Sequence, residues 1–207
     1  MKILLISNKN INEINSGGTE IFTNKLSKEL NKNEVIIFNE DISKVKIPSS
    51  KILRKFGLDY YNKFMKKRLI KSISEINPDI IHFNGFYGIS TNSIKLISKK
   101  YPTVITVHDV WISEYSNRVP KFINNTHKKI VYNHLKDILL ISPSKFIYDK
   151  LKEIGYKRIK IIHNGVDIPK TTTSYDKNIL FVGRITEEKG LQTVISSLNN
   201  IKDYNIL

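Results

Sequence analysis

The chain has 207 residues, a formal net charge of +15, 40% hydrophobic residues and no cysteine. These values exclude a wholly disordered chain, a disulfide scaffold and any cysteine-based site. Apolar blocks such as Ile3 to Ile6 are far shorter than the roughly 18 residues of a membrane-spanning helix. The N-terminus lacks the pattern of a secretory signal, so we expect a cytoplasmic protein.

Short apolar segments alternate along the chain with segments of helical periodicity. Strands are predicted at 2–7, 34–38, 79–83, 103–107, 137–142 and 158–163. Helices are predicted at 19–31, 58–76, 91–100, 120–135 and 143–154, the first with Ile21, Phe22, Leu26 and Leu30 on its inward face. This alternation predicts an α/β fold with a doubly wound, Rossmann-like parallel sheet.

The pattern changes after residue 167. Residues 168–177 are polar and β-branched without an apolar period, which is typical of a linker. A strand at 178–182, a helix at 190–198 and a strand at 204–207 then restart the alternation. We therefore expect an N-terminal domain at 1–167, a linker at 168–177, and at 178–207 the first βαβ unit of a second, incomplete Rossmann-like domain. So short a segment cannot bury a core alone, so we expect this unit to be begun and cut off.

The basic charge has an ordinary explanation in the composition. The chain holds 29 Lys against 5 Arg, with 35 Ile, 21 Asn and no Ala, which is typical of A/T-rich coding. Nucleic-acid sites usually use arginine for bidentate contacts, so we expect a solvated lysine surface and no nucleic-acid partner. A general attraction for anions remains.

Candidate site residues gather where the predicted strands end. Ligands of an open parallel sheet bind outside the carboxyl ends of its strands. The polar and glycine residues at these ends include Asn84, Gly85, His108, Asp109, Ser144 and Asn164. A histidine at such an end can exchange a proton with a ligand, although a lone histidine more often bonds only to local backbone.

Two further groups could bind a diphosphate. Gly17-Gly18 precedes a helix start, whose free amides and dipole suit an anion; alone, the same pair is more often a simple turn. Arg184 and Lys189 flank the start of a later helix, but Glu187 and Glu188 could neutralise both. No dinucleotide or phosphate-loop glycine motif, no metal-ligand spacing and no Asp-x-Asp pair occurs, so we expect neither a metal nor a cofactor.

Residues 44–71 hold ten Lys/Arg and one acidic residue, Asp59, with large apolar residues between them. Such a segment could lie on an anionic membrane, which would make the protein peripheral at the inner membrane face. A helix that packs on its own sheet with a lysine outer face explains the same pattern.

Six motifs in order carry a family resemblance. They are Gly17-Gly18-Thr19-Glu20, Pro78-Asp79-Ile80-Ile81-His82, Thr106-Val107-His108-Asp109, Ser142-Pro143-Ser144, His163-Asn164-Gly165-Val166-Asp167, and Val182-Gly183-Arg184 with Lys189-Gly190. Together they resemble the family-four glycosyltransferases of the GT-B fold. The resemblance implies a retaining, metal-independent enzyme that moves a sugar from a nucleotide sugar to a glycan or lipid-linked acceptor.

The resemblance also implies residue roles. Gly17 and Gly18 would approach the donor diphosphate, and Arg184 and Lys189 would hold it. His108, with Asp109, would sit beside the transferred sugar. Residues on the acceptor side of the cleft would be Glu20, Asn84, Gly85, Ser144 and Asn164.

The chain departs from the family pattern in one respect. It ends before the Glu-x7-Glu segment that contacts the nucleotide sugar in the family, so we expect weak or no transferase activity from these residues alone. Turnover of a nucleotide sugar by the purified chain would refute that expectation. A sugar-nucleotide epimerase of the same fold and a non-catalytic module that binds an acceptor or anionic lipid stay open as alternatives.

Overall fold

The structure is a computed structural model that describes residues 1–7, 17–38, 60–86, 89–113, 120–168, 178–183, 185–197 and 205–206. The chain divides into two compact units, Met1–Gly165 and Val166–Leu207. The predicted domain boundary falls just after this division. Most of the predicted linker and the first part of the basic segment, residues 44–59, lie outside the described residues.

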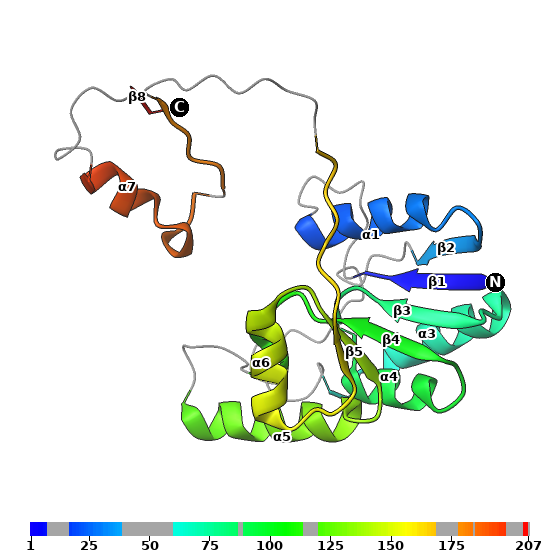
Figure 1. The fold of residues 1–207 in the computed structure, drawn as a ribbon. Coiled ribbons are helices and arrows are strands. Elements are labelled where there is room, and N and C mark those ends of the chain that lie inside the picture. The colour runs from blue at the N-terminus through cyan, green and yellow to red at the C-terminus, as the bar shows by residue number, and fades with distance from the viewer. Residues whose placement is uncertain are drawn as a thin grey trace. The chain divides into compact units, whose positions relative to one another are not determined.

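The first unit is built on a sheet of six parallel strands. They are β1 (Lys2–Ile6), β2 (Glu34–Phe38), β3 (Ile80–Phe83), β4 (Thr103–Thr106), β5 (Leu139–Ser142) and β6 (Ile159–Ile161). Their spatial order is β2-β1-β3-β4-β5-β6, and their carboxyl ends lie at one edge (Figure 1). Strand β2 is added on one side of β1, and β3 and the later strands are added on the other side. The sheet is therefore doubly wound, and the predicted fold class is confirmed.

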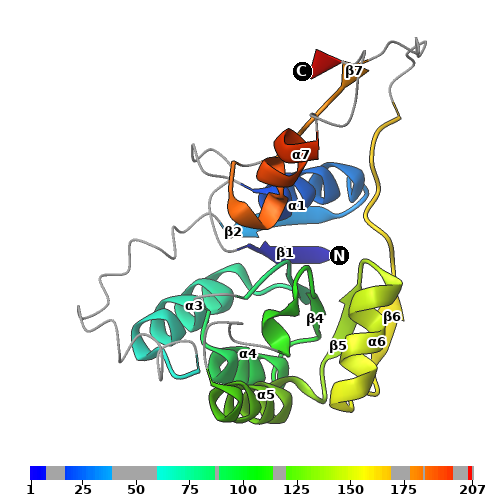
Figure 2. The same cartoon turned by 90° about the vertical axis from the view of Figure 1, so that its left-hand side faces the viewer.

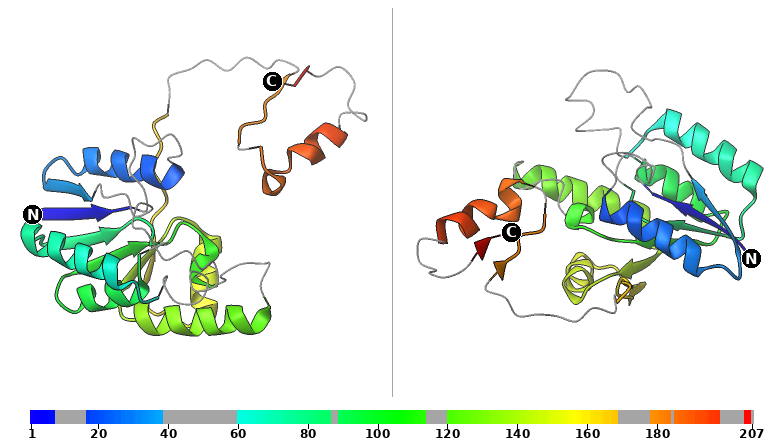
Figure 3. Two further views of the ribbon diagram at one scale, coloured as in Figure 1. Left: turned by 180° about the vertical axis from the view of Figure 1, so that it is seen from behind. Right: turned by 90° about the horizontal axis from the view of Figure 1, so that it is seen from above.

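The two faces of the sheet are covered by different helices. On one face, Leu4, Ile6, Ile81, Phe83 and Ile105 form a buried core. The helices α3 (Lys63–Ile76), α4 (Thr91–Ser98), α5 (Lys121–Leu135) and α6 (Lys145–Ile154) all contribute buried side chains to it. Helix α1 (Gly18–Glu29) contacts β1 and β2, and β1 lies between α1 and α4–α5 in both Figure 1 and Figure 2. The view from behind in Figure 3 shows α1 and α5 at opposite sides of the unit.

Helix α1 is rotated relative to the sequence-based prediction. The predicted inward residue Ile21 is 52% exposed, whereas Glu20 and Thr23 are buried. Glu20 and Thr23 are one turn apart on a helix and share a face, and Ile21 is turned about 100° away from Glu20. The prediction for Ile21 is therefore wrong, and the rotation buries the Glu20 side chain in its place.

Two helix ends show the left-handed conformation. Gly155 caps α6 with a φ of +106°. Asn77 caps α3 with a φ of +48° immediately before Pro78, which cannot continue a helix. No helix in the described ranges is long and apolar enough to cross a membrane.

The second unit contains one βαβ unit. Strands β7 (Asn178–Ile179) and β8 (Asn205–Ile206) pair in parallel, and α7 (Leu191–Ser197) lies between them in the chain. Strand β7 is shorter than predicted, and Leu180 and Val182 after it are exposed. Helix α7 begins one residue later than predicted, since Gly190 takes a left-handed φ of +72° after the short helix η4 (Glu187–Lys189).

Candidate functional site

The start of α1 holds backbone N–H groups for which the helix itself supplies no acceptor. Gly17 is its N-cap residue, and the Gly17 N–H donates to Glu20 Oε2 at 2.8 Å. The next amides, of Gly18, Thr19 and Glu20, lie in the first turn, where an α-helix supplies no partner of its own for them. A Cβ added to Gly18 would meet no atom within 4 Å. The positive end of the α1 dipole therefore lies at Gly17 and Gly18, with room for a Cβ at Gly18.

His108 lies just past the carboxyl end of β4 and against α1. Its ring is 5.3 Å from the Phe22 ring, edge to face. Burial lowers the pKa of His108, and the nearby carboxylates of Asp109 and Glu20 oppose that shift. Its Nε2 atom is buried and has no hydrogen-bond partner. His108 is thus a neutral imidazole with one unmet hydrogen-bonding position beside α1.

A second histidine, His82, lies near His108. His82, on β3, is 2.8 Å through Nε2 from the Thr106 hydroxyl on β4. Burial, and secondarily the proximity of His108, lower the pKa of His82 to about 4, so His82 is neutral near pH 7. The sequence places His82 two positions before Asn84, and alternation along a strand is the signal that puts both on one face.

Asn84 follows β3 and is fully buried. Its backbone N–H donates to the Ile6 carbonyl at 2.8 Å, yet neither its amide nitrogen nor its amide oxygen has a hydrogen-bond partner. Gly85 then takes a φ of +126°, which a residue with a side chain rarely adopts. Buried polar groups are nearly always bonded, so this amide is a candidate ligand contact.

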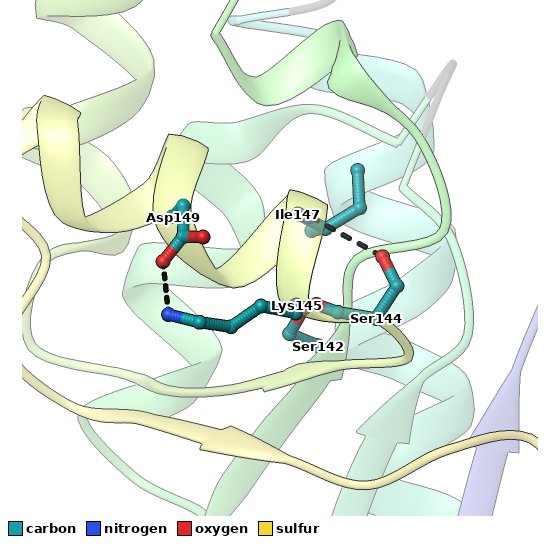
Figure 4. A network of polar contacts seen from close by, with 5 residues as sticks. All are labelled: Ser142, Ser144, Lys145, Ile147 and Asp149. Carbon is teal, nitrogen blue, oxygen red and sulfur yellow. Dashed lines mark hydrogen bonds and ion pairs between the residues drawn. The ribbon is translucent and has the colours of Figure 1, made fainter.

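Three other predicted site residues have structural contacts or lie in solvent. Asp109 is exposed, and its Oδ1 accepts from the Trp111 N–H at 2.9 Å, which caps the short helix η3 (Val110–Ile112). The Ser144 hydroxyl caps α6 by accepting from the Ile147 N–H at 3.3 Å, and the Ser144 carbonyl accepts from the Ser142 hydroxyl at 2.6 Å (Figure 4). Asn164 lies on an exposed segment after β6.

The two cations predicted to hold the diphosphate, Arg184 and Lys189, belong to the second unit. Lys189 ends η4 and is exposed, and Arg184 lies outside the described residues. In the first unit, the structure brings together Gly17, Gly18, Glu20 and His108. Their association with Arg184 and Lys189 stays a prediction.

A cavity of about 400 Å³ lies at the opposite edge of the sheet. It is lined by the starts of β3, β4 and β5 and by Lys95, Lys99, Asp137 and Arg158. Lys95 is in the last turn of α4, where a cation stabilises the negative end of the helix dipole. The Arg158 guanidinium donates to the Asp137 carbonyl at 2.6 Å. These contacts give Lys95 and Arg158 structural roles, at the end of the sheet away from His108 and Asn84.

Among the described residues, no group of three or more His, Asp or Glu side chains could hold a metal ion. The sequence motifs that carry the family resemblance likewise contain no Asp-x-Asp pair.

Comparison with known proteins gives a consistent result. The model of a family described as Glycosyltransferase Family 4 matches residues 16–170. An uncharacterised 42.6 kDa protein in the cps region of Klebsiella pneumoniae is 29% identical over 179 residues, which are 76% of this chain and 47% of that protein. The chain therefore spans about half the length of this relative.

Solved structures show the same fold. Anabaena Alr3699/HepE in complex with UDP-glucose matches with a TM-score of 0.67 at 16% identity, over 100% of this chain and 59% of HepE. HepE with UDP and glucose matches with a TM-score of 0.66 at 16% identity, over 98% of this chain and 59% of HepE. The likeness extends over the whole of this chain and part of HepE.

Proposed function

Because the chain belongs to glycosyltransferase family 4, we propose that it supplies the acceptor-side domain of a retaining glycosyltransferase. The donor would be a nucleotide diphosphate sugar, and the acceptor a glycan or a lipid-linked glycan. Residues 1–167 would form this domain, 168–177 the linker, and 178–207 the start of the donor-binding domain.

One observation carries the proposal most directly. His108, at the end of β4, packs on Phe22 of α1. An α-helix supplies no partner of its own for the amides of its first turn. A diphosphate on those amides would have its charge offset by the helix dipole. A sugar hydroxyl beside it would meet the unpaired Nε2 of His108.

The proposed reaction exchanges two bonds at the anomeric carbon. The bond from this carbon to the diphosphate oxygen breaks, and a bond to the acceptor hydroxyl oxygen forms on the same face of the sugar. The acceptor proton passes to the departing diphosphate, so the charges balance. Arg184 and Lys189 would offset negative charge on the leaving group. We propose no metal for this role, because the chain lacks an Asp-x-Asp pair.

The test is an NMR titration of the 207-residue chain with UDP and with UDP-glucose, the ligand of the HepE structure. Both probes should shift the amide signals of Gly18, Thr19 and Glu20, because both carry a diphosphate. Only UDP-glucose should shift the His108 ring signals. His108→Ala should weaken binding of UDP-glucose but not of UDP, as measured at the Gly18, Thr19 and Glu20 amides. His163→Ala, at an exposed histidine after β6, should weaken neither. Signal changes confined to the cavity at the opposite edge would contradict the proposal.

A second proposal concerns the outer face of α3. Lys63, Lys67, Arg68 and Lys71 are exposed there beside Ile70, which is 41% exposed, and Lys71 pairs with Glu75 at 3.8 Å. An excess of cations next to an apolar side chain suits an anionic lipid surface on which a lipid-linked acceptor would lie. At low salt the protein should co-sediment with vesicles that contain phosphatidylserine. The double variant Lys67→Glu/Lys71→Glu should not co-sediment with them.

A further inference from the structure

The turn that carries His108 and Asp109 is tied to α5 by a chain of hydrogen bonds. Asp109 caps η3 through the Trp111 N–H, and the Ser113 N–H closes η3 by donating to the Val110 carbonyl at 2.8 Å. The Trp111 carbonyl is within hydrogen-bond distance of His127 Nε2, on α5. His127 is 1% exposed, so this contact is shielded from water.

The partners of His127 fix its protonation. A carbonyl oxygen can only accept, so Nε2 of His127 must carry the hydrogen that it donates to Trp111. In the neutral ring, Nδ1 is then the acceptor, and the Tyr60 hydroxyl, 2.7 Å away, donates to it. Burial lowers the pKa of His127, which favours this neutral ring.

Aromatic packing reinforces the same connection. The Trp111 ring meets the His127 ring edge to face at 4.6 Å and the Phe86 ring at 5.3 Å. Phe86 lies two residues beyond Asn84, so the end of β3 is held by the same cluster.

Tyr60 lies at the other end of this series of hydrogen bonds. Its backbone carbonyl accepts from the Ser90 hydroxyl at 2.6 Å and from the Asn92 N–H at 3.1 Å. Ser90 is the N-cap residue of α4. The hydrogen bonds therefore run from the start of α4, through Tyr60 and His127, to the turn after β4.

We propose that His127 is a positioning residue for the His108–Asp109 turn. With Nε2–H on the Trp111 carbonyl and Nδ1 receiving the Tyr60 hydroxyl, it fixes η3 and so the direction in which His108 leaves β4. Its value for sugar transfer rests on the proposed function. The positioning itself can be measured without any ligand. A failure of the positioning proposal can therefore be distinguished from a failure of the proposed function.

The experiment compares substitutions on one face of α5. His127→Phe keeps a ring against Trp111 but removes both hydrogen bonds, and His127→Gln restores an N–H donor and an oxygen acceptor. His134→Phe is the matched control. His134 lies two helical turns later on the same helix, is 8% exposed, and is 2.8 Å through Nδ1 from the Thr91 hydroxyl on α4, not η3.

Three readouts follow the turn in the full 207-residue chain. Hydrogen exchange at the Trp111 and Ser113 amides should speed up roughly five- to tenfold in His127→Phe, the factor that one lost hydrogen bond corresponds to. Emission of Trp111, the only tryptophan in the chain, should shift to the red, and the His108 ring signals should move. His127→Gln should recover most of each change, and His134→Phe should leave all three near wild type.

The outcome is decisive in either direction. If His127→Phe and His134→Phe change the Trp111 amide and emission equally, or if neither changes them, His127 does not position the turn. Should His127→Phe fail to fold, Tyr60→Phe removes a single hydroxyl and should change the same readouts in the same direction at smaller amplitude. Wild-type exchange at Trp111 in Tyr60→Phe would then overturn the proposal.

Discussion

Four histidines of the first unit, His82, His108, His127 and His134, lie wholly or partly out of solvent, and burial lowers the pKa of each. In the unfolded chain these rings bind protons near pH 6.5. At mildly acidic pH the unfolded state therefore binds more protons than the folded state. The free energy of unfolding must then fall as the pH falls.

His82 allows the sharpest test, because its pKa is lowered to about 4. Its contribution should be complete above pH 6.5, decline between pH 6.5 and about 4, and change little below that. The full loss is on the order of 3 kcal/mol. His82→Gln, which can still bond to Thr106, should remove this share of the pH dependence in urea unfolding. His163→Gln, at an exposed site, should not; an unchanged slope in His82→Gln would contradict the assignment.

Replacement by leucine should have opposite effects on the free energy of unfolding at two buried asparagines, Asn84 and Asn62. The Asn84 amide has no partner, whereas Asn62 Oδ1 accepts from the Met65 N–H at 3.0 Å and caps α3. Asn84→Leu should leave the free energy of unfolding unchanged or raise it by about 1 kcal/mol, because it removes unmet polar groups. Asn62→Leu should lower it by about 1–2 kcal/mol through loss of the cap. Equal destabilisation in urea titrations would show that Asn84 is structural, with no place for a ligand.

At the scale of helices, the left-handed caps distinguish glycine from asparagine. At Gly155 an added Cβ would be in ordinary contact with the Tyr132 ring, at 3.7 Å, but the φ of +106° is unfavourable for alanine. Gly155→Ala should lower the free energy of unfolding by about 1–2 kcal/mol. Asn77→Gly, at a φ of +48°, should change it by less than about 0.5 kcal/mol. Thermal melts of both variants measure the difference; similar losses would contradict the cap assignment.

Local pattern was sufficient to predict the strands but not their ends. Apolar runs such as the one in β1 predict burial on both faces, and all six strands of the first unit occur where expected. Strand ends depend on the neighbouring strand: β6 stops at Ile161, after which the Ile162 N–H makes a last bond to the Ser142 carbonyl. A run of apolar residues carries no information about where that partner ends.

The candidate site was predictable to the same extent. The rule that ligands bind at carboxyl ends found His108 and Asn84, because it needs only the order of strands. It could not show that Asp109 and Ser144 cap helices, since their partners depend on local turn geometry. It also missed His127, whose partner Tyr60 is 67 positions away in the chain.

On the scale of the whole molecule, the core belongs to one part of the chain. Among the described residues, every buried hydrophobic side chain lies between Ile3 and Tyr156. Helix α7 has no buried residue. Apolar burial is the main favourable term in folding, so the first unit holds the residues that make folding cooperative.

We therefore expect residues 1–165 to fold without the rest of the chain. The isolated segment should give a single cooperative urea transition with the far-ultraviolet signal of an α/β protein. A peptide of residues 166–207 should show no transition, because a chain of about 40 residues buries too little surface to be stable alone. The control is a 1–135 segment, which lacks β5, α6 and β6 and should be unfolded. Cooperative unfolding of the 166–207 peptide, or a disordered 1–165 segment, would mean that the core does not sit within the first unit.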